Sequence, residues 1–235
     1  EAAPTFENTI VELERAGDAF ARISTIYGIW GGNLSTPEFQ VVQREMAPKL
    51  SALSDKITQN EALFKRIETV FNSPGKAKLT PEQQRLTWVY YTNFVRAGAR
   101  LNSEQKARLS QINQELAKLF TTFGQNLLSE ENDQYVVLSS AADLAGLSQS
   151  LKDSTSAAAS SKKVANTVGI IVNTRSSVDP FLTYSERRDL REKVWRMFVN
   201  RGDNGDAKDN NAIISNILQL RAERAKLLGF KTHAH

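Results

Sequence analysis

Residues 184–235 read YSERRDLREKVWRMFVNRGDNGDAKDNNAIISNILQLRAERAKLLGFKTHAH and predict two long helices joined by a polar loop. In the first helix Leu190, Val194 and Phe198 recur every four residues, which places apolar side chains on one side. Gly202 is a typical helix stop, and the following Asp-Asn-Gly-Asp at 203–206 has turn chemistry. The stretch therefore predicts a helical hairpin.

The second helix of this hairpin is capped by Asp209 or Asn210 and ends at Gly229. Its apolar residues occupy two sides, one with Ile213, Ile217 and Leu220, the other with Ile214, Leu218 and Leu228. A lone surface helix needs one stripe. We therefore expect the second stripe to be buried by another part of a longer protein, and the isolated chain to self-associate or to be sparingly soluble.

The chain before this hairpin is also predicted to be helical. Helix starts are indicated at Thr5, Thr36-Pro37, Asn60, Thr80-Pro81 and Asn102. The apolar stripe from Phe6 to Tyr27 predicts one helix of about six turns. Pro48 lies inside the next helix and predicts a kink or a break near Glu45.

Residues 135–182 differ in character from the rest. Tyr135–Leu138 and Val168–Val172 are short extended candidates. The serine- and alanine-rich run 148–163 allows a weakly packed helix, a mobile loop, or both in turn. We therefore predict a mainly α fold with at most a small β-hairpin. Its parts are a helical subdomain (1–134), a mixed segment with a mobile stretch (135–182) and a helical hairpin (183–235).

The composition is ordinary for a soluble globular protein. The 235 residues are 40% hydrophobic and 24% charged, with no cysteine and a net charge of +4. Without cysteine the segment has no disulfide and no thiolate metal site; this fits the cytoplasm and allows the periplasm. Basic residues are scattered among acidic ones, so we do not expect nucleic acid as a partner. No apolar run approaches the roughly 18 residues needed to span a membrane, so we do not expect a membrane as a partner either.

Several blocks of sequence resemble the thimet-oligopeptidase and peptidyl-dipeptidase family of zinc metallopeptidases. They are PTFENTIVELERAG, QREMAPKLSALSDKI, FVRAGARLNSEQKARLSQINQELAKLFTTFGQNLL and REKVWRMFVNRGDNGDAKDN followed by IISNILQLRAERAKLLGF. The RGDNGD version is most similar to the bacterial dipeptidyl carboxypeptidase branch. Matching blocks run from about Pro4 to His235 and are weakest at 148–166.

The resemblance implies a helical, deep-channelled enzyme that cuts short peptides. Its zinc is held by a His-Glu-x-x-His helix and a further Glu, and this chain has no such motif. The chain would then be the N-terminal, non-catalytic part and form one wall of the channel. Zinc would belong to the parent protein, and the partners would be short peptides and the C-terminal catalytic half. The alternative is a non-enzymatic helical protein-interaction module.

The residues that could carry chemistry in this chain have structural explanations. His233 and His235 are two apart, whereas zinc ligands on one helix face are three or four apart. Asp203, Asp206 and Asp209 resemble a calcium loop, but the positions that need glycine and glutamate hold Lys208 and Ile214, so helix capping is the favoured interpretation. We therefore predict no catalytic, cofactor-binding or metal residue in this chain.

Two further expectations concern side-chain placement. Polar groups near Tyr90 and Arg201 could face the channel that the family resemblance implies. Trp30, Trp88 and Trp195 are expected to pack in cores, because two of them lie within amphipathic helices.

Overall fold

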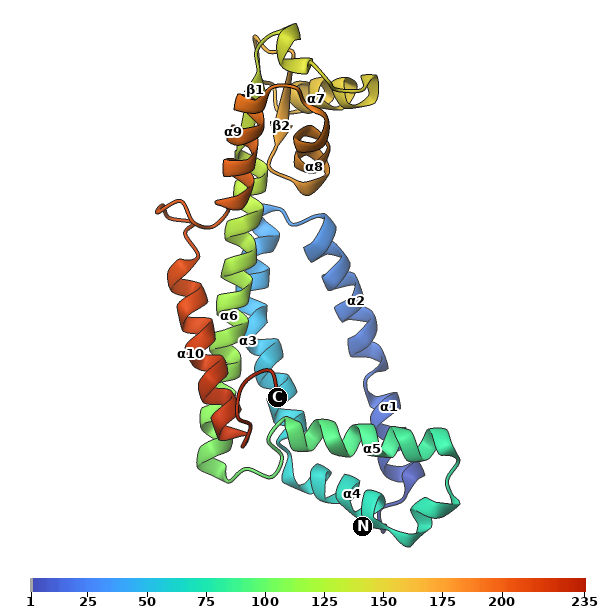
Figure 1. The fold of residues 1–235 in the computed structure, drawn as a ribbon. Coiled ribbons are helices and arrows are strands. Elements are labelled where there is room, and N and C mark those ends of the chain that lie inside the picture. Colours follow the sequence, from blue (N-terminus) through green and yellow to red (C-terminus); the bar gives the residue numbers. More distant parts are fainter. Residues whose placement is uncertain (1) are drawn as a thin grey trace. The chain divides into compact units, whose positions relative to one another are not determined.

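A computed structural model describes residues 2–235 and confirms a mainly helical fold (Figure 1). The elements in chain order are η1 (Phe6–Val11), α1 (Glu12–Ala16), α2 (Asp18–Asn33), α3 (Pro37–Thr58), α4 (Glu61–Asn72), η2 (Pro74–Lys78), α5 (Pro81–Arg96), α6 (Ser103–Asp133), β1 (Tyr135–Leu138), η3 (Ala141–Leu144), α7 (Gln149–Ser161), β2 (Gly169–Val172), α8 (Arg175–Tyr184), α9 (Arg188–Val199) and α10 (Asn211–Leu227).

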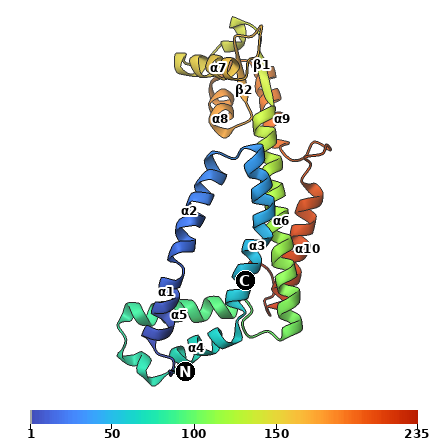
Figure 2. The ribbon, with the colours of Figure 1, turned by 180° about the vertical axis from the view of Figure 1, so that it is seen from behind.

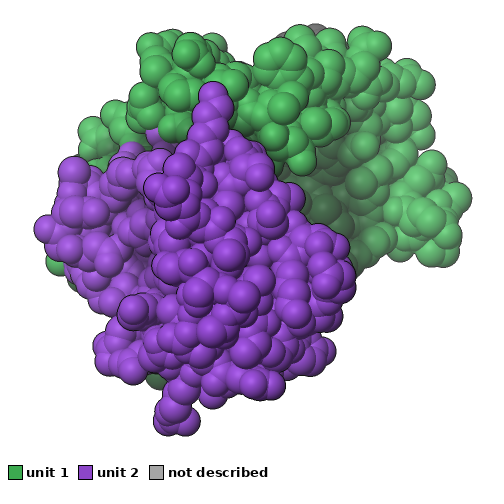
Figure 3. Space-filling model, turned by 90° about the horizontal axis from the view of Figure 1, so that it is seen from above, with its two compact units in different colours: residues 1–121, 216–235 green, residues 122–215 purple. Residues whose placement is uncertain are grey.

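The chain divides into two compact units, which Figure 3 shows in different colours. The first unit contains the described residues up to Thr121 together with 216–235, and the second contains 122–215. Helices α6 and α10 therefore each contribute residues to both units. The predicted division into parts 1–134, 135–182 and 183–235 concerns roles in a larger protein and stays a prediction.

The first unit has its core where η1, α4 and α5 meet. Phe6, Ile10, Phe64, Ile67 and Phe94 are buried together there. The capping signals explain where these helices begin. At the starts of η1 and α5, the side chains of Thr5 and Thr80 accept hydrogen bonds from the backbone N–H of the residue three positions later. The side chain of that later residue accepts from the backbone N–H of the threonine, which forms a capping box. Both predicted helix starts are thus confirmed.

The prediction of one continuous six-turn helix from Phe6 to Tyr27 is wrong, because the structure divides this stretch into η1, α1 and α2. A turn at Gly17 separates α1 from α2, because glycine weakens a helix interior. Helix α3 starts at the Thr36 cap as predicted, but it continues without a break through Pro48. Figures 1 and 2 show α2 standing apart from α3 along most of its length.

The N-terminal part of α6 packs within the first unit. Asn102 and Gln105 exchange backbone-to-side-chain hydrogen bonds and fix its start. Leu109, Ile112 and Leu116 are buried. The Arg108 guanidinium donates to both carboxylate oxygens of Glu223 on α10, at 2.6 and 2.7 Å, a bidentate pair that fixes orientation.

The second unit contains a two-stranded antiparallel sheet in which Tyr135 pairs with Val172 and Leu138 with Gly169. Both predicted strands are thus confirmed. Helix α7 packs closely on β2: a Cβ on Gly169 would lie 2.4 Å from Thr155 Oγ1, so this position requires glycine. The serine- and alanine-rich run therefore forms a helix that packs on the sheet. Its mobility stays a prediction.

The core of the second unit lies between the sheet, α8 and α9, where Leu138, Ile171, Val178, Phe181 and Val194 are buried. The predicted apolar stripe of α9 thus supplies part of this core. The expectation for the tryptophans is wrong: Trp30, Trp88 and Trp195 are all among the exposed large side chains. Arg85 and Arg196 instead lie over the rings of Trp88 and Trp195. In the described part of the chain, no helix is both long and apolar enough to cross a membrane.

Candidate functional site

The loop between α9 and α10 is held by acidic residues of the last turns of α6, all within the second unit. Glu130 is 1% exposed, and its carboxylate accepts hydrogen bonds from the backbone N–H of Gly202 at 2.8 Å and from Asn204 Nδ2 at 2.9 Å. Gly202 has a φ of +72°, a left-handed conformation that glycine adopts without strain. The buried carboxylate thus fixes the backbone at the point where α9 ends.

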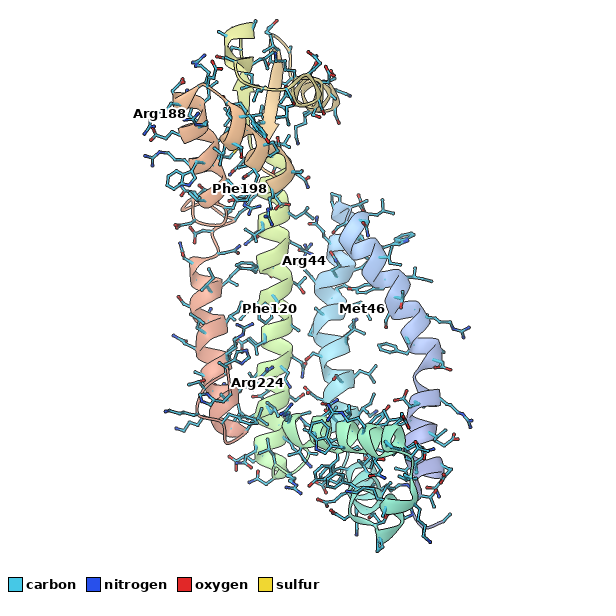
Figure 4. The ribbon with its side chains drawn as sticks, turned by 45° about the vertical axis from the view of Figure 1, so that its right-hand side comes forward. Arg44, Met46, Phe120, Arg188, Phe198 and Arg224 are labelled. Carbon is cyan, nitrogen blue, oxygen red and sulfur yellow. The ribbon has the colours of Figure 1, made fainter. Side chains whose placement is uncertain are left out.

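Two ion pairs extend this anchoring. Arg201 Nη1 lies 2.6 Å from Glu131 Oε1, and Lys208 Nζ lies 2.7 Å from Asp133 Oδ2. The hydrogen bond from Lys208, followed by that from Ser129, lowers the pKa of the Asp133 carboxyl. Arg201 also covers the ring of Phe198, which Figure 4 labels. Arg201, which the sequence suggested could face a channel, thus contacts Glu131 and Phe198 within its own unit.

Two of the three aspartates of the loop, Asp206 and Asp209, cap backbone N–H groups. Asp209 accepts from the backbone N–H of Gly205 at 2.9 Å and of Asn211 at 2.8 Å, and these two donors hold the pKa of its carboxyl below the usual range. Asp203 accepts from Asn211 Nδ2 at 2.6 Å, and Asp206 accepts from the Lys208 N–H at 2.8 Å. The favoured interpretation of this cluster as helix capping agrees with these bonds.

The second predicted channel candidate, Tyr90 on α5, contacts α1. Its phenolic oxygen donates to Glu14 Oε1 at 2.5 Å. Burial, and then this hydrogen bond and the charge of Glu14, raise the pKa of the Tyr90 hydroxyl. Tyr90 thus links the packed core of the first unit to the helix that leads into α2. Tyr90 and Arg201 belong to different units and each has a partner in its own unit.

The two histidines lie beside a shallow hollow of about 260 Å³ near the end of α10, lined also by Arg96, Arg224 and Phe230. His235 Nδ1 lies 2.7 Å from Thr232 Oγ1. Burial, and then the charges of Arg221 and Arg224, lower the pKa of the His233 ring. Arg224, labelled in Figure 4, also donates to Asn113.

These residues do not fit zinc. Across residues 2–235, no group of three or more His, Cys, Asp or Glu side chains is placed to hold a metal ion. The arginines near His233 also oppose a second positive charge at that position.

One cavity in the second unit was not anticipated from the sequence. It has a volume of about 280 Å³ and lies between α7, β2 and the start of α8. Leu151, Ile171 and Phe181 line its apolar part, and Ser154 and Ser177 add hydroxyl groups. The buried anchor Glu130 was also missed. Its signal is a glutamate that continues the apolar stripe of α6 three residues after Leu127.

The polar clusters described above thus stabilise the helices and loops of their own units. Comparison with known proteins shows which proteins the chain is similar to. The pattern described as Peptidase family M3 matches residues 181–235. Dipeptidyl carboxypeptidase of Salmonella typhimurium is 33% identical over 233 residues, covering 99% of this chain and 34% of that protein. The Escherichia coli protein of the same name is 31% identical over 231 residues, covering 98% and 34%.

Oligopeptidase A of Escherichia coli is 27% identical over 239 residues, covering 100% of this chain and 35% of that protein. The chain thus spans about a third of the length of the curated relatives it matches. The predicted resemblance is confirmed: residues 181–235 match Peptidase family M3, and nearly the whole chain is similar to part of the proteins named dipeptidyl carboxypeptidase and oligopeptidase A.

Proposed function

We propose that this chain is the N-terminal, non-catalytic part of a zinc metallopeptidase that hydrolyses short peptides. One observation carries the proposal: a protein named dipeptidyl carboxypeptidase aligns with 99% of this chain, and the chain accounts for 34% of that protein. The relatives' names further support release of C-terminal dipeptides as the reaction of the parent protein.

The zinc ion would be held by the part of the parent protein that lies outside this chain. Bound there, zinc would activate a water molecule and polarise the peptide carbonyl. This chain would form one wall of the substrate channel. A rigid wall orients an extended peptide and excludes folded proteins, which lowers the entropic part of the barrier. The ion pairs and caps that hold the loop after α9 supply such rigidity.

The alternative, a non-enzymatic helical interaction module, has one observation in its favour. Helix α2 exposes several large apolar side chains, and exposed apolar patches commonly mark interaction surfaces. The same helix fits a peptidase whose remaining part covers it. An assay on the complete protein therefore separates the two functions.

The test compares the complete parent protein with the isolated chain of residues 1–235. We expect the parent to cleave a quenched fluorescent peptide, to lose activity with a chelator and to regain it with zinc. Mass spectrometry of the products should show C-terminal dipeptides. The isolated chain should neither cleave peptide nor bind zinc stoichiometrically. An inactive parent would overturn the peptidase assignment, and chelator-sensitive cleavage by the isolated chain would overturn its non-catalytic role.

A further inference from the structure

Helix α2 carries a row of large apolar side chains that point into solvent. Ile23 is 67% exposed and Ile26 is 59% exposed. Phe20, Ile29 and Trp30 are also exposed, as is Leu34 directly after the helix, and none of the 16 residues of α2 is buried. We call these six side chains the α2 face. Burial of large apolar side chains is the dominant favourable contribution to folding, so leaving this row in water forgoes a large stabilisation.

Few contacts join α2 to its chain neighbours α1 and α3. Near its C-terminal end the rings of Tyr27 and Trp30 lie 5.4 and 5.9 Å from the ring of Phe39 on α3. At its N-terminal end it follows α1, which Tyr90 holds through Glu14. Figures 1 and 4 show α2 separated from α3 between these ends. The middle of the α2 face is thus left without a cover inside the first unit.

The composition of α2 does not suit a helix that remains in water on all sides. Its only charged residues are Asp18 and Arg22, and it contains Gly28, Gly31 and Gly32. A helix of this length is marginal in water without tertiary packing, and each glycine lowers its stability further relative to alanine. The helix therefore requires a partner that buries its apolar side.

The size of the face argues against a second copy of this chain as that partner. Sixteen residues form a helix about 24 Å long and about 10 Å wide. Two such faces pressed together cover roughly 480 Å² in total, whereas a stable dimer interface needs at least about 1,200 Å². A segment joined covalently to the chain has a high effective concentration, so a small contact area is sufficient for it.

We infer that the α2 face is the docking surface for the part of the parent protein that lies outside this chain. The inference rests on the proposed function, because the relatives extend about two thirds of their length beyond the matched region. The sequence pattern pointed to the second stripe of α10 instead. That stripe is less exposed overall: Ile214 and Leu218 are 41% and 59% exposed, but Leu228 is partly buried. The main apolar docking surface therefore lies on α2.

The absence of cysteine in this chain permits a direct test by thiol labelling. Ile26→Cys reports on the α2 face. Ala21→Cys reports on the opposite side of the same helix, because the exposed Ala21 shares that side with Gly28 and Gly32. Each variant is made in the isolated chain and in a parent protein from which other reactive cysteines have been removed. Circular dichroism confirms that each variant is folded.

In the isolated chain both cysteines should react at similar rates. In the parent protein the Ile26→Cys thiol should react at least about tenfold more slowly, while the Ala21→Cys thiol stays within about threefold of its rate in the isolated chain. Similar rates for the two thiols in the parent would overturn the inference. Protection of Ile26→Cys that rises with the concentration of the isolated chain would assign the face to a second copy, and would also overturn it. Labelling does not depend on activity, so an inactive parent with a protected α2 face would refute the proposed peptidase alone.

Discussion

The corner formed by η1, α4 and α5 and the neighbouring helix α2 have similar apolar spacing in the sequence but opposite environments. In the corner Ile67 is fully buried, and Phe64 stacks near Tyr91 and Phe94 with ring centroids 6.0 and 6.4 Å apart. In α2, Ile23 and Ile26 face solvent. Apolar periodicity thus predicts that a helix forms and which side it will bury, but it does not predict whether the partner lies in the same segment.

The difference has a physical origin in what each helix meets. Helices α4 and α5 are joined by the short η2 turn and fold against each other, and η1 fills the space beside them with Phe6 and Ile10. Helix α2 is also joined to α3 by a short connection, but the two helices separate beyond the contact at Phe39. Helices α4 and α5 thus have η1 as a third packing partner, whereas no described element of the first unit covers the middle of α2 in the same way.

The largest expected effect comes from the same substitution made in both regions. Ile67→Ala should lower the free energy of unfolding of the isolated chain by about 2–5 kcal/mol, because it removes buried methyl groups and leaves a cavity. Ile23→Ala should change it by less than about 0.5 kcal/mol, because the side chain is already in water. Urea unfolding followed by circular dichroism measures both. Equal losses would show that Ile23 is packed and would contradict the comparison.

A smaller effect is expected where the two regions are joined. Tyr90→Phe removes the hydrogen bond from α5 to Glu14 and should cost about 0.5–1.5 kcal/mol. Glu14 is exposed and stays hydrated in the variant, so the loss should fall in the lower part of that range. Glu14→Gln serves as a control, because it keeps an acceptor for the hydroxyl while it removes the charge.

The alkaline pH dependence of stability tests the same contact. The folded state raises the pKa of the Tyr90 hydroxyl, so its contribution is fully present below the unfolded pKa of about 10 and is lost as the pH rises above it. The stability difference between the wild type and Tyr90→Phe should therefore shrink above about pH 10. A difference that stays constant up to pH 12 would show that Glu14 and burial do not act on this hydroxyl.

The smallest effect concerns α2 itself. Gly28 has no neighbouring atom within 4 Å of an added Cβ, so Gly28→Ala should stabilise the helix by up to about 1 kcal/mol. Amide exchange in α2 should then slow by about fivefold or less. The reverse change Ala21→Gly should speed exchange by a similar factor. Slower exchange in both variants would show that propensity does not govern this helix.

Local signals predicted much of this fold. The caps at Thr5, Thr36, Asn60 and Thr80 and the two strands were predictable because each depends on neighbouring residues. The absence of a zinc-binding helix motif could likewise be read directly from the sequence.

Features set by distant contacts were not predictable from the sequence. The burial of Glu130 depends on a loop more than 70 residues away, and the exposure of Trp195 depends on what α9 packs against. The exposure of the apolar side chains of α2 was not predicted for the same reason. A stripe of apolar residues does not reveal which neighbours will be present to cover it.

Hydrogen exchange on the isolated chain and on the parent protein tests the central claim most directly. In the isolated chain, amides in the middle of α2 should exchange at least about tenfold faster than those of α4, and faster than those of α7, which packs on β2. In the parent protein the amides of α2 should become as protected as those of α4. The central claim is that the apolar face of α2 is buried only by the part of the parent protein outside this chain. Protection of α2 equal to that of α4 in the isolated chain, or a lack of protection in the parent, would contradict it.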